Sequence, residues 1–122
     1  MRLNEVVYSG GVPVDGYGPG FFRVGGEARQ GAVLIGPGGV GDWAGLDDRE
    51  PLLALAGEID VLFVGMGAEI APLPAALRNV LEGAGLGVEV MASPAACRTY
   101  NVLLGEGRRV AVALLPIDGE AE

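Results

Sequence analysis

The chain has 122 residues, the size of one domain, and half of them are hydrophobic, which is enough for a sizeable core. It contains no lysine and no histidine, and its eight arginines face sixteen carboxylates, for a net charge of −8 at pH 7. This acidity argues against a protein that binds the phosphate backbone of nucleic acids and against binding to anionic membranes. The single cysteine, Cys97, excludes an internal disulfide and suits a reducing compartment.

The start of the chain, MRLNEVVYSGG, has neither the apolar run of a secretion signal nor the Arg/Ser-rich composition of a transit peptide. No stretch approaches the roughly 20 apolar residues that span a bilayer. We therefore expect a cytoplasmic protein with one domain over 1–122.

The first half predicts short strands between glycine-rich turns. Residues 1–20 are expected to be irregular, with a turn-rich loop at 14–20. The apolar runs at 21–24 and 32–36 predict two strands of a hairpin, joined by a somewhat long connection at 25–31.

The second half alternates strand and helix signals. Continuous apolar runs predict buried strands, and Asp, Pro or Ser before an amphipathic stretch predicts a helix start. The expected order is a helix from Asp47 or Asp48 to about Gly57, a strand at 60–65, a helix from Pro72 or Pro74 to 83–85, a strand at 87–91, a helix from Ser93 to Leu104, a strand at 108–117 and a frayed acidic tail at 117–122. This β-α-β-α-β pattern predicts an α/β fold with helices on a largely parallel sheet, plus the N-terminal β-hairpin element.

The most unusual stretch is AACRTYN at 95–101, which gathers polar residues inside the last predicted helix. At helical spacing Cys97 lies at the edge of the apolar face, and Arg98 and Asn101 share the neighbouring face. The apolar face itself is formed by Ala96, Tyr100, Leu103 and Leu104.

Arg98 lies in the second turn of that helix, near the positive end of the helix dipole, where a cation is disfavoured by up to about 1 kcal/mol. A negative group is therefore expected beside it, and two alternatives stay open. One is an internal ion pair with a carboxylate; the other is an anionic ligand or a carboxylate of a partner. The internal candidates are Asp60, Glu69 and Glu89.

Nucleophilic and metal chemistry have little support. Cys97 has no histidine to act as its base, so a small buried hydrophobe is the simpler interpretation. Gly65 and Gly67 follow a strand as in a dinucleotide-binding loop, but Ile70 occupies the third glycine position, which favours a tight turn. We assign no catalytic residue, no metal ligand and no cofactor.

Five stretches together resemble the Mth-type domain family of unknown function, which includes mitochondrial respiratory complex I assembly factor three and the adipogenesis-associated Mth-domain protein. The resemblance runs from about residue 5 to 116 and implies a three-layer α/β domain with a central mixed sheet. For function, it implies protein–protein contacts of the kind that assemble NADH:ubiquinone oxidoreductase. The stretches are DGYGPGFFRV (15–24), GPGGVGDW (36–43), DVLFVGMG (60–67), LPAALRNVLEGAGLGVEVM (73–91) and AACRTYNVLLGEGRRVAVALL (95–115).

Two hypotheses follow. The first is a non-enzymatic binding or assembly module for a protein partner, with a respiratory-complex subunit as one candidate and oligomeric state left open. The second is a protein for small anionic ligands, or a cryptic enzyme, with its site at the carboxyl ends of the strands near Gly67 and Arg98. The site residues proposed under these hypotheses are Gly65, Gly67, Ser93, Cys97, Arg98, Tyr100 and Asn101.

Overall fold

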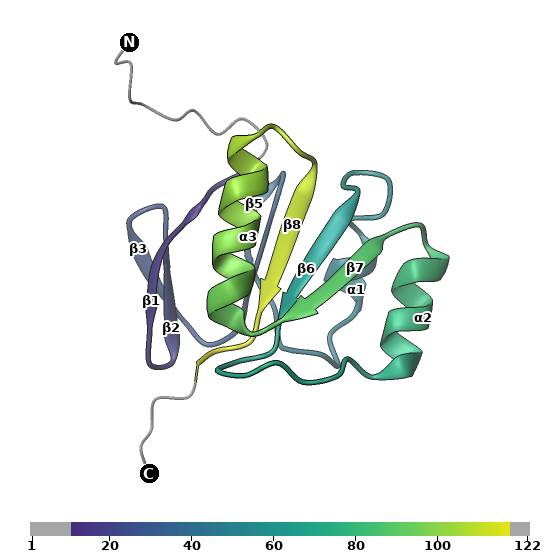
Figure 1. Ribbon diagram of the computed structural model, residues 1–122, viewed down its shortest axis with the longest axis horizontal. Helices are drawn as coiled ribbons and strands as arrows, with labels where there is room; N and C mark the ends of the chain where they lie inside the picture. The colour runs from purple at the N-terminus through teal and green to yellow at the C-terminus, as the bar shows by residue number, and fades with distance from the viewer. Residues whose placement is uncertain (1–10, 118–122) are drawn as a thin grey trace.

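The computed structural model describes residues 11–117, which form a mixed α/β domain with two sheets and three helices (Figure 1). The strands are β1 (Val14–Gly18), β2 (Phe21–Val24), β3 (Glu27–Gln30), β4 (Val33–Gly36), β5 (Gly39–Asp42), β6 (Val61–Gly65), β7 (Gly87–Met91) and β8 (Val110–Leu114). The helices are α1 (Glu50–Leu53), α2 (Ala75–Gly83) and α3 (Ser93–Gly105). The segments expected at 1–10 and 118–122, including most of the acidic tail, lie outside the described residues.

The larger sheet has the strand order β5-β4-β8-β6-β7. Strands β8, β6 and β7 are parallel, whereas β4 runs antiparallel to both β8 and β5. The expected β-α-β-α-β unit is confirmed as β6-α2-β7-α3-β8. The sheet is mixed, as expected, but only two of its four strand pairings are parallel, so "largely parallel" describes only its carboxyl-terminal half.

The inner strands β4, β8 and β6 are buried on both faces, and successive residues of each strand point to opposite sides of the sheet. In β8, Val112 packs against α3 and the smaller sheet, while Ala111 and Ala113 pack on the side of α1 and α2. The strand predicted at 108–117 is confirmed as the shorter β8, and all five of its residues are buried.

The smaller sheet, in the order β1-β2-β3, corrects the expected hairpin. The segment at 25–31 is not a connection, because Gly25 and Gly26, with φ of 61° and 85°, turn the chain from β2 directly into β3. Two consecutive residues with positive φ form the two-residue hairpin turn that glycine pairs favour. The stretch at 14–20, expected as a loop, contains β1, and β4 belongs to the other sheet.

The region between β4 and β6 also differs from expectation. Strand β5 follows β4 after a short turn, and helix α1 is a single turn rather than a helix from Asp47 or Asp48 to Gly57. The side chain of Asp48 accepts the backbone N–H of Ala44 at 3.0 Å and caps no helix. Asp48 therefore stabilises the loop that brings Trp43 into the core.

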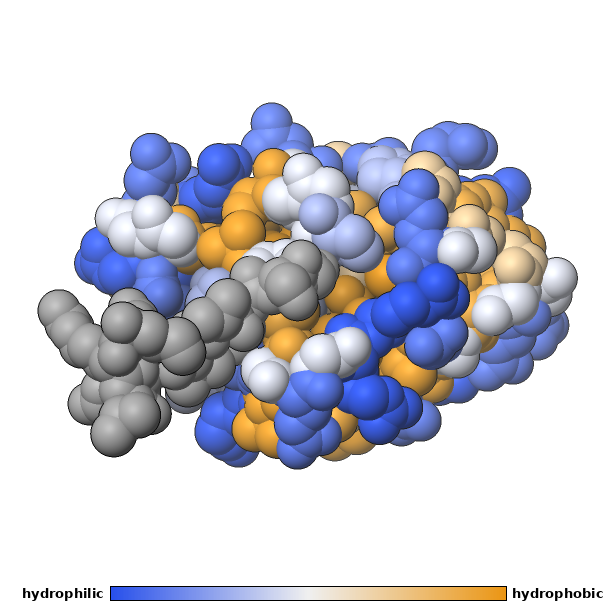
Figure 2. Space-filling model, turned by 90° about the horizontal axis from the view of Figure 1, so that it is seen from above, coloured by the Kyte–Doolittle hydropathy of each residue, from blue (hydrophilic) through white to orange (hydrophobic). Residues whose placement is uncertain are grey.

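Figure 2 shows the end of the molecule at which β6, β7 and β8 begin, where a band of hydrophilic residues crosses an otherwise largely apolar middle. At this end Arg109 Nη2 lies 3.0 Å from Asp60 Oδ1, which joins the starts of β8 and β6. The carboxyl ends of the parallel strands, and the start of α3, lie at the opposite end.

Candidate functional site

Helix α3 carries most of the residues predicted for the site. It begins at Ser93, with Pro94 in its first turn, where the missing proline N–H costs no helical hydrogen bond. It ends at Gly105, one residue beyond the predicted end at Leu104. The predicted apolar face is confirmed, since Leu103 is half-buried and the remaining members are buried together with Cys97: Ala96, Tyr100 and Leu104.

Tyr100 and Asn101 bind the amino-terminal part of the chain. The Tyr100 hydroxyl donates to the carbonyl oxygen of Val12 at 2.9 Å. The Asn101 amide makes two bonds with Val14: its Oδ1 accepts the backbone N–H at 2.9 Å, and its Nδ2 donates to the carbonyl oxygen at 2.8 Å. These side chains therefore attach the segment that leads into β1, and β1 itself, to α3, and they stabilise the smaller sheet on this helix.

Ser93 joins the carboxyl ends of two strands. Its Oγ accepts the backbone N–H of Gly67 at 2.9 Å and donates to the carbonyl oxygen of Leu115 at 2.8 Å. The Ser93 N–H donates in turn to the carbonyl oxygen of Gly67 at 2.7 Å. The Gly67 N–H, which an anion at this edge would bind, is therefore used inside the protein.

The two glycines of the GMG sequence serve different purposes. Gly67 has φ of +100°, a conformation that favours glycine, so it makes the turn that the sequence predicts. Gly65 has no such φ, but a Cβ there would lie 2.7 Å from Ser93 Oγ and 2.8 Å from Ser93 Cα. Glycine at position 65 thus lets the first turn of α3 pack directly against the backbone of β6.

Cys97 is buried in the core between α3 and the sheet, with 3% of its surface exposed. Burial raises the pKa of its thiol from 9.0 to about 12, and the charge of Arg98 opposes this shift only in part. The thiolate needed for nucleophilic chemistry is therefore scarce at neutral pH. Burial also raises the pKa of Tyr100. Within residues 11–117, His, Cys, Asp and Glu form no group that fits a metal ion.

Arg98 points away from the core and is exposed. Among the described residues, none of the ion pairs involves it, and Asp60, one of its expected partners, binds Arg109 at the other end of the molecule. Together with Thr99, Val102 and Leu103, Arg98 lines a shallow hollow of about 250 Å³. Val102 is 59% exposed, which is high for a branched apolar side chain on a helix.

The seven predicted residues therefore lie in separate places. Gly65, Gly67 and Ser93 pack against one another at the carboxyl ends of the strands, whereas Tyr100 and Asn101 contact the segment that leads into β1. Their roles in binding stay predictions.

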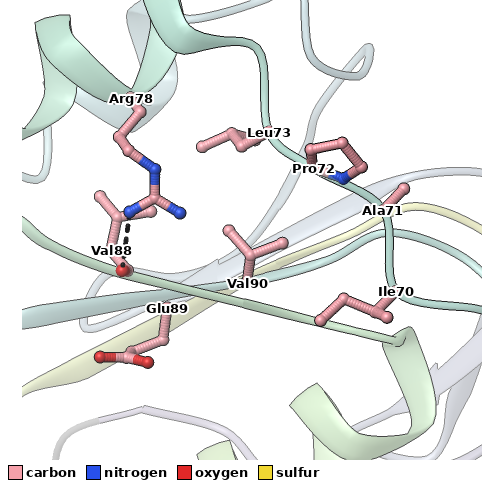
Figure 3. Close-up of a pocket in the computed structure, with 8 residues that line it drawn as sticks. All are labelled: Ile70, Ala71, Pro72, Leu73, Arg78, Val88, Glu89 and Val90. Atoms are coloured by element: carbon pink, nitrogen blue, oxygen red, sulfur yellow. Dashed lines mark hydrogen bonds between the residues drawn. The ribbon is translucent and has the colours of Figure 1, made fainter.

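Sequence reasoning missed a hollow of about 540 Å³ between the loop at 70–73, Arg78 and β7 (Figure 3). The sequence feature that could have indicated this hollow is Ile70, an apolar residue in a loop, which is 67% exposed in the structure.

No helix in the described part of the chain is long and apolar enough to cross a membrane.

Sequence comparison finds similar proteins in bacteria and animals. An uncharacterized protein of Rhodobacter capsulatus is 50% identical over 119 residues, which cover 98% of this chain and 96% of that protein. The animal proteins called NADH dehydrogenase [ubiquinone] 1 alpha subcomplex assembly factor 3 are more distant. The one from Danio rerio is 30% identical over 88% of this chain and 66% of its own length, and the human one is 29% identical over 87% and 61%.

Solved structures show the same fold. A crystal structure described as an outer membrane protein from Bartonella henselae aligns with a TM-score of 0.82 at 34% identity, covering 92% of this chain and all of that one. A solution structure of a Mth938-like domain from Bordetella pertussis aligns with a TM-score of 0.77 at 28% identity, covering 99% and 94% of the two chains. The resemblance to the Mth-type domain family is therefore confirmed. The chain belongs to the family described as a protein of unknown function, DUF498/DUF598, which matches residues 14–115.

Proposed function

We propose that the protein is a binding module that helps to assemble a multi-subunit complex through protein–protein contacts, and that it acts in the cytoplasm. The observation that carries this proposal is the similarity of nearly nine-tenths of the chain to proteins named as assembly factors of NADH dehydrogenase. The chain spans about three-fifths to two-thirds of those proteins, so the shared domain is the part that the proposal concerns. A subunit or assembly intermediate of NADH dehydrogenase is the first partner to test.

The outer side of α3 is the surface that we assign to the partner. Arg98 presents an exposed guanidinium beside the exposed apolar Val102, over the shallow hollow that Thr99 and Leu103 help to line. An arginine beside an apolar hollow is typical of the residues that dominate protein interfaces. A carboxylate of the partner would bind Arg98 with a charge-assisted hydrogen bond.

Affinity purification under mild salt tests this proposal. The tagged wild-type protein is expected to recover subunits of NADH dehydrogenase, and Arg98→Ala is expected to reduce their yield by at least about tenfold, as loss of an interface arginine does. Arg23→Ala is the matched control, because Arg23 is an exposed arginine on β2, away from α3. Equal recovery with Arg98→Ala and Arg23→Ala would remove α3 from the interface, and recovery of no such subunit by the wild type would contradict the assembly role.

A further inference from the structure

Strand β7 is the outermost strand of the larger sheet next to α2, and within residues 11–117 it pairs with β6 alone. Gly87 N–H donates to Asp60, and the Met91 carbonyl oxygen accepts the Met66 N–H, so both residues face the β6 side. Because backbone groups alternate in direction along a parallel strand, Val88 and Val90 point theirs outward, away from β6. The outer edge of β7 therefore presents a row of backbone donors and acceptors.

This edge forms one wall of the 540 Å³ groove in Figure 3. The opposite wall is the loop at 70–73, and Figure 3 shows the Val90 side chain pointing toward that wall, while Glu89 points to the other face of β7. Ile70 is largely exposed, although Leu73 is buried. The groove thus combines backbone hydrogen-bonding groups with apolar side chains, which is what an added strand binds.

Only one outward group of β7 has a partner among the described residues. The Val88 carbonyl oxygen accepts from Arg78 Nη1 at 3.5 Å, which is at the long limit of a hydrogen bond. The same nitrogen binds Glu82 Oε2 at 3.1 Å, so Glu82 already balances the charge of Arg78. No hydrogen bond within 11–117 uses the Val88 N–H or either backbone group of Val90.

The charge around the edge selects the occupant. Arg78 is paired with Glu82, so among the described residues that line the groove Glu89 is the charge with no ion pair within 11–117, on a chain whose net charge is −8. A second copy of the chain fits poorly, because it carries the same net charge of −8, and the two-fold register that pairs Val88 with Val90 places Glu89 directly opposite its own copy. Like charges directly opposite in a strand pair are destabilising.

We propose that the outer edge of β7 binds an extended segment of a partner protein, antiparallel to β7, in which one lysine or arginine lies between two apolar residues. The apolar residues pair with Val88 and Val90 and pack toward Ile70 and Leu73, and the basic residue lies opposite Glu89. Antiparallel pairing is the more stable arrangement per residue. The backbone of the segment displaces the long contact from Arg78. This surface does not depend on α3 or on an assembly role.

Fluorescence anisotropy with blocked, labelled heptapeptides tests the proposal on the intact protein. Thr-Thr-Val-Lys-Val-Thr-Thr is expected to bind about fivefold more tightly than the same peptide with Glu in place of Lys. Methylation of both valine nitrogens removes the donors that face β7 and is expected to weaken binding at least about tenfold. The amide resonances of Val88 and Val90 are expected to shift when the lysine peptide binds.

A charge reversal adds a matched control. Glu89→Lys is expected to reverse the preference between the two peptides, whereas Glu58→Lys, at another exposed glutamate, is expected to leave it unchanged. Binding that ignores the valine methylation, a preference that survives Glu89→Lys, or no binding up to about 1 mM peptide would each overturn the proposal. A wild-type dimer that Val90→Pro converts to a monomer would place a second copy on this edge and also overturn it.

Discussion

The two sides of α3 differ in what their polar groups contact. On the inner side, Ser93, Tyr100 and Asn101 use their hydroxyl and amide groups on backbone atoms that come from distant parts of the chain. On the outer side, Arg98 makes no ion pair with any residue from 11 to 117 and lies beside exposed Val102.

This difference explains why polar residues gather in the stretch at 95–101. At about 100° per residue, Arg98 and Asn101 lie only about 60° apart, which is why the sequence predicts that they share a face. In the structure that face is divided, because Asn101 is half-buried and binds Val14, whereas Arg98 is exposed. Asn101 supplies a donor and an acceptor for the backbone of Val14 at the start of β1. The inner polar residues stabilise the fold, and the outer one is available for binding, so the two groups respond differently to substitution.

The largest effect is expected from Gly65→Ala, which tests how closely the inner side of α3 packs on β6. The added methyl would meet Ser93 Oγ, Ser93 Cα and Leu114 Cδ2 within 2.9 Å, so the first turn of α3 must move. We expect a loss of about 3 kcal/mol in the free energy of unfolding, measured by urea denaturation. Gly83→Ala is the control, because its methyl would meet nothing within 4 Å. Equal stability of the two variants would show that α3 approaches β6 less closely.

Asn101→Ala is expected to cost about 2 kcal/mol, because it removes both hydrogen bonds to Val14 and leaves that backbone without partners. Exchange of the Val14 amide hydrogen should accelerate at the same time, since its acceptor is lost. Asn79→Ala, at an exposed position of α2, provides the matched control. Should Asn101→Ala cost no more than Asn79→Ala, the inner side of α3 would not hold the smaller sheet.

The sequence predicted the carboxyl-terminal half of the fold far better than the amino-terminal half, for a physical reason. Strands β6 and β8 are buried on both faces and appear as continuous apolar runs, and β7 alternates apolar and exposed residues, all three near clear helix signals. Strand β3, with sequence EARQ, has one half-buried residue and three exposed ones, so it carries no apolar pattern. Only the Gly25–Gly26 pair indicated the hairpin, and its significance as a two-residue turn was missed.

The candidate site was harder to predict than the fold. Helical spacing predicted that Tyr100 is buried and that Arg98 is not on the core face, and both are confirmed. It could not indicate that Asn101 binds Val14, a contact between residues 87 positions apart. Local sequence patterns also could not indicate that β7 lies at the edge of the sheet, because the order of strands follows from the crossovers of the whole chain.

The pH dependence of stability measures how thoroughly the inner side excludes water. Above pH 9 the unfolded chain loses the thiol proton of Cys97, whereas the folded chain keeps it up to about pH 12. The unfolded state is therefore favoured as pH rises, and Cys97 alone should lower stability by about 1.4 kcal/mol per pH unit in that window. Cys97→Ala removes this contribution, so denaturation of both proteins between pH 9 and 11 should give curves that converge as pH rises. Parallel curves would mean that water reaches the thiol.

The smallest effect on stability is expected from Arg98→Ala. This variant tests most directly whether the outer side of α3 differs from the inner side. The outer side contributes no ion pair within 11–117, and removing a cation from the amino-terminal half of a helix relieves repulsion by the helix dipole. Stability should therefore stay within about 0.5 kcal/mol of the wild type, or rise slightly. Thermal and urea denaturation beside Arg23→Ala provide the measurement. A loss of several kcal/mol would instead reveal an internal carboxylate left without its partner, and Arg98 would then belong with Ser93, Tyr100 and Asn101 among the residues that stabilise the fold.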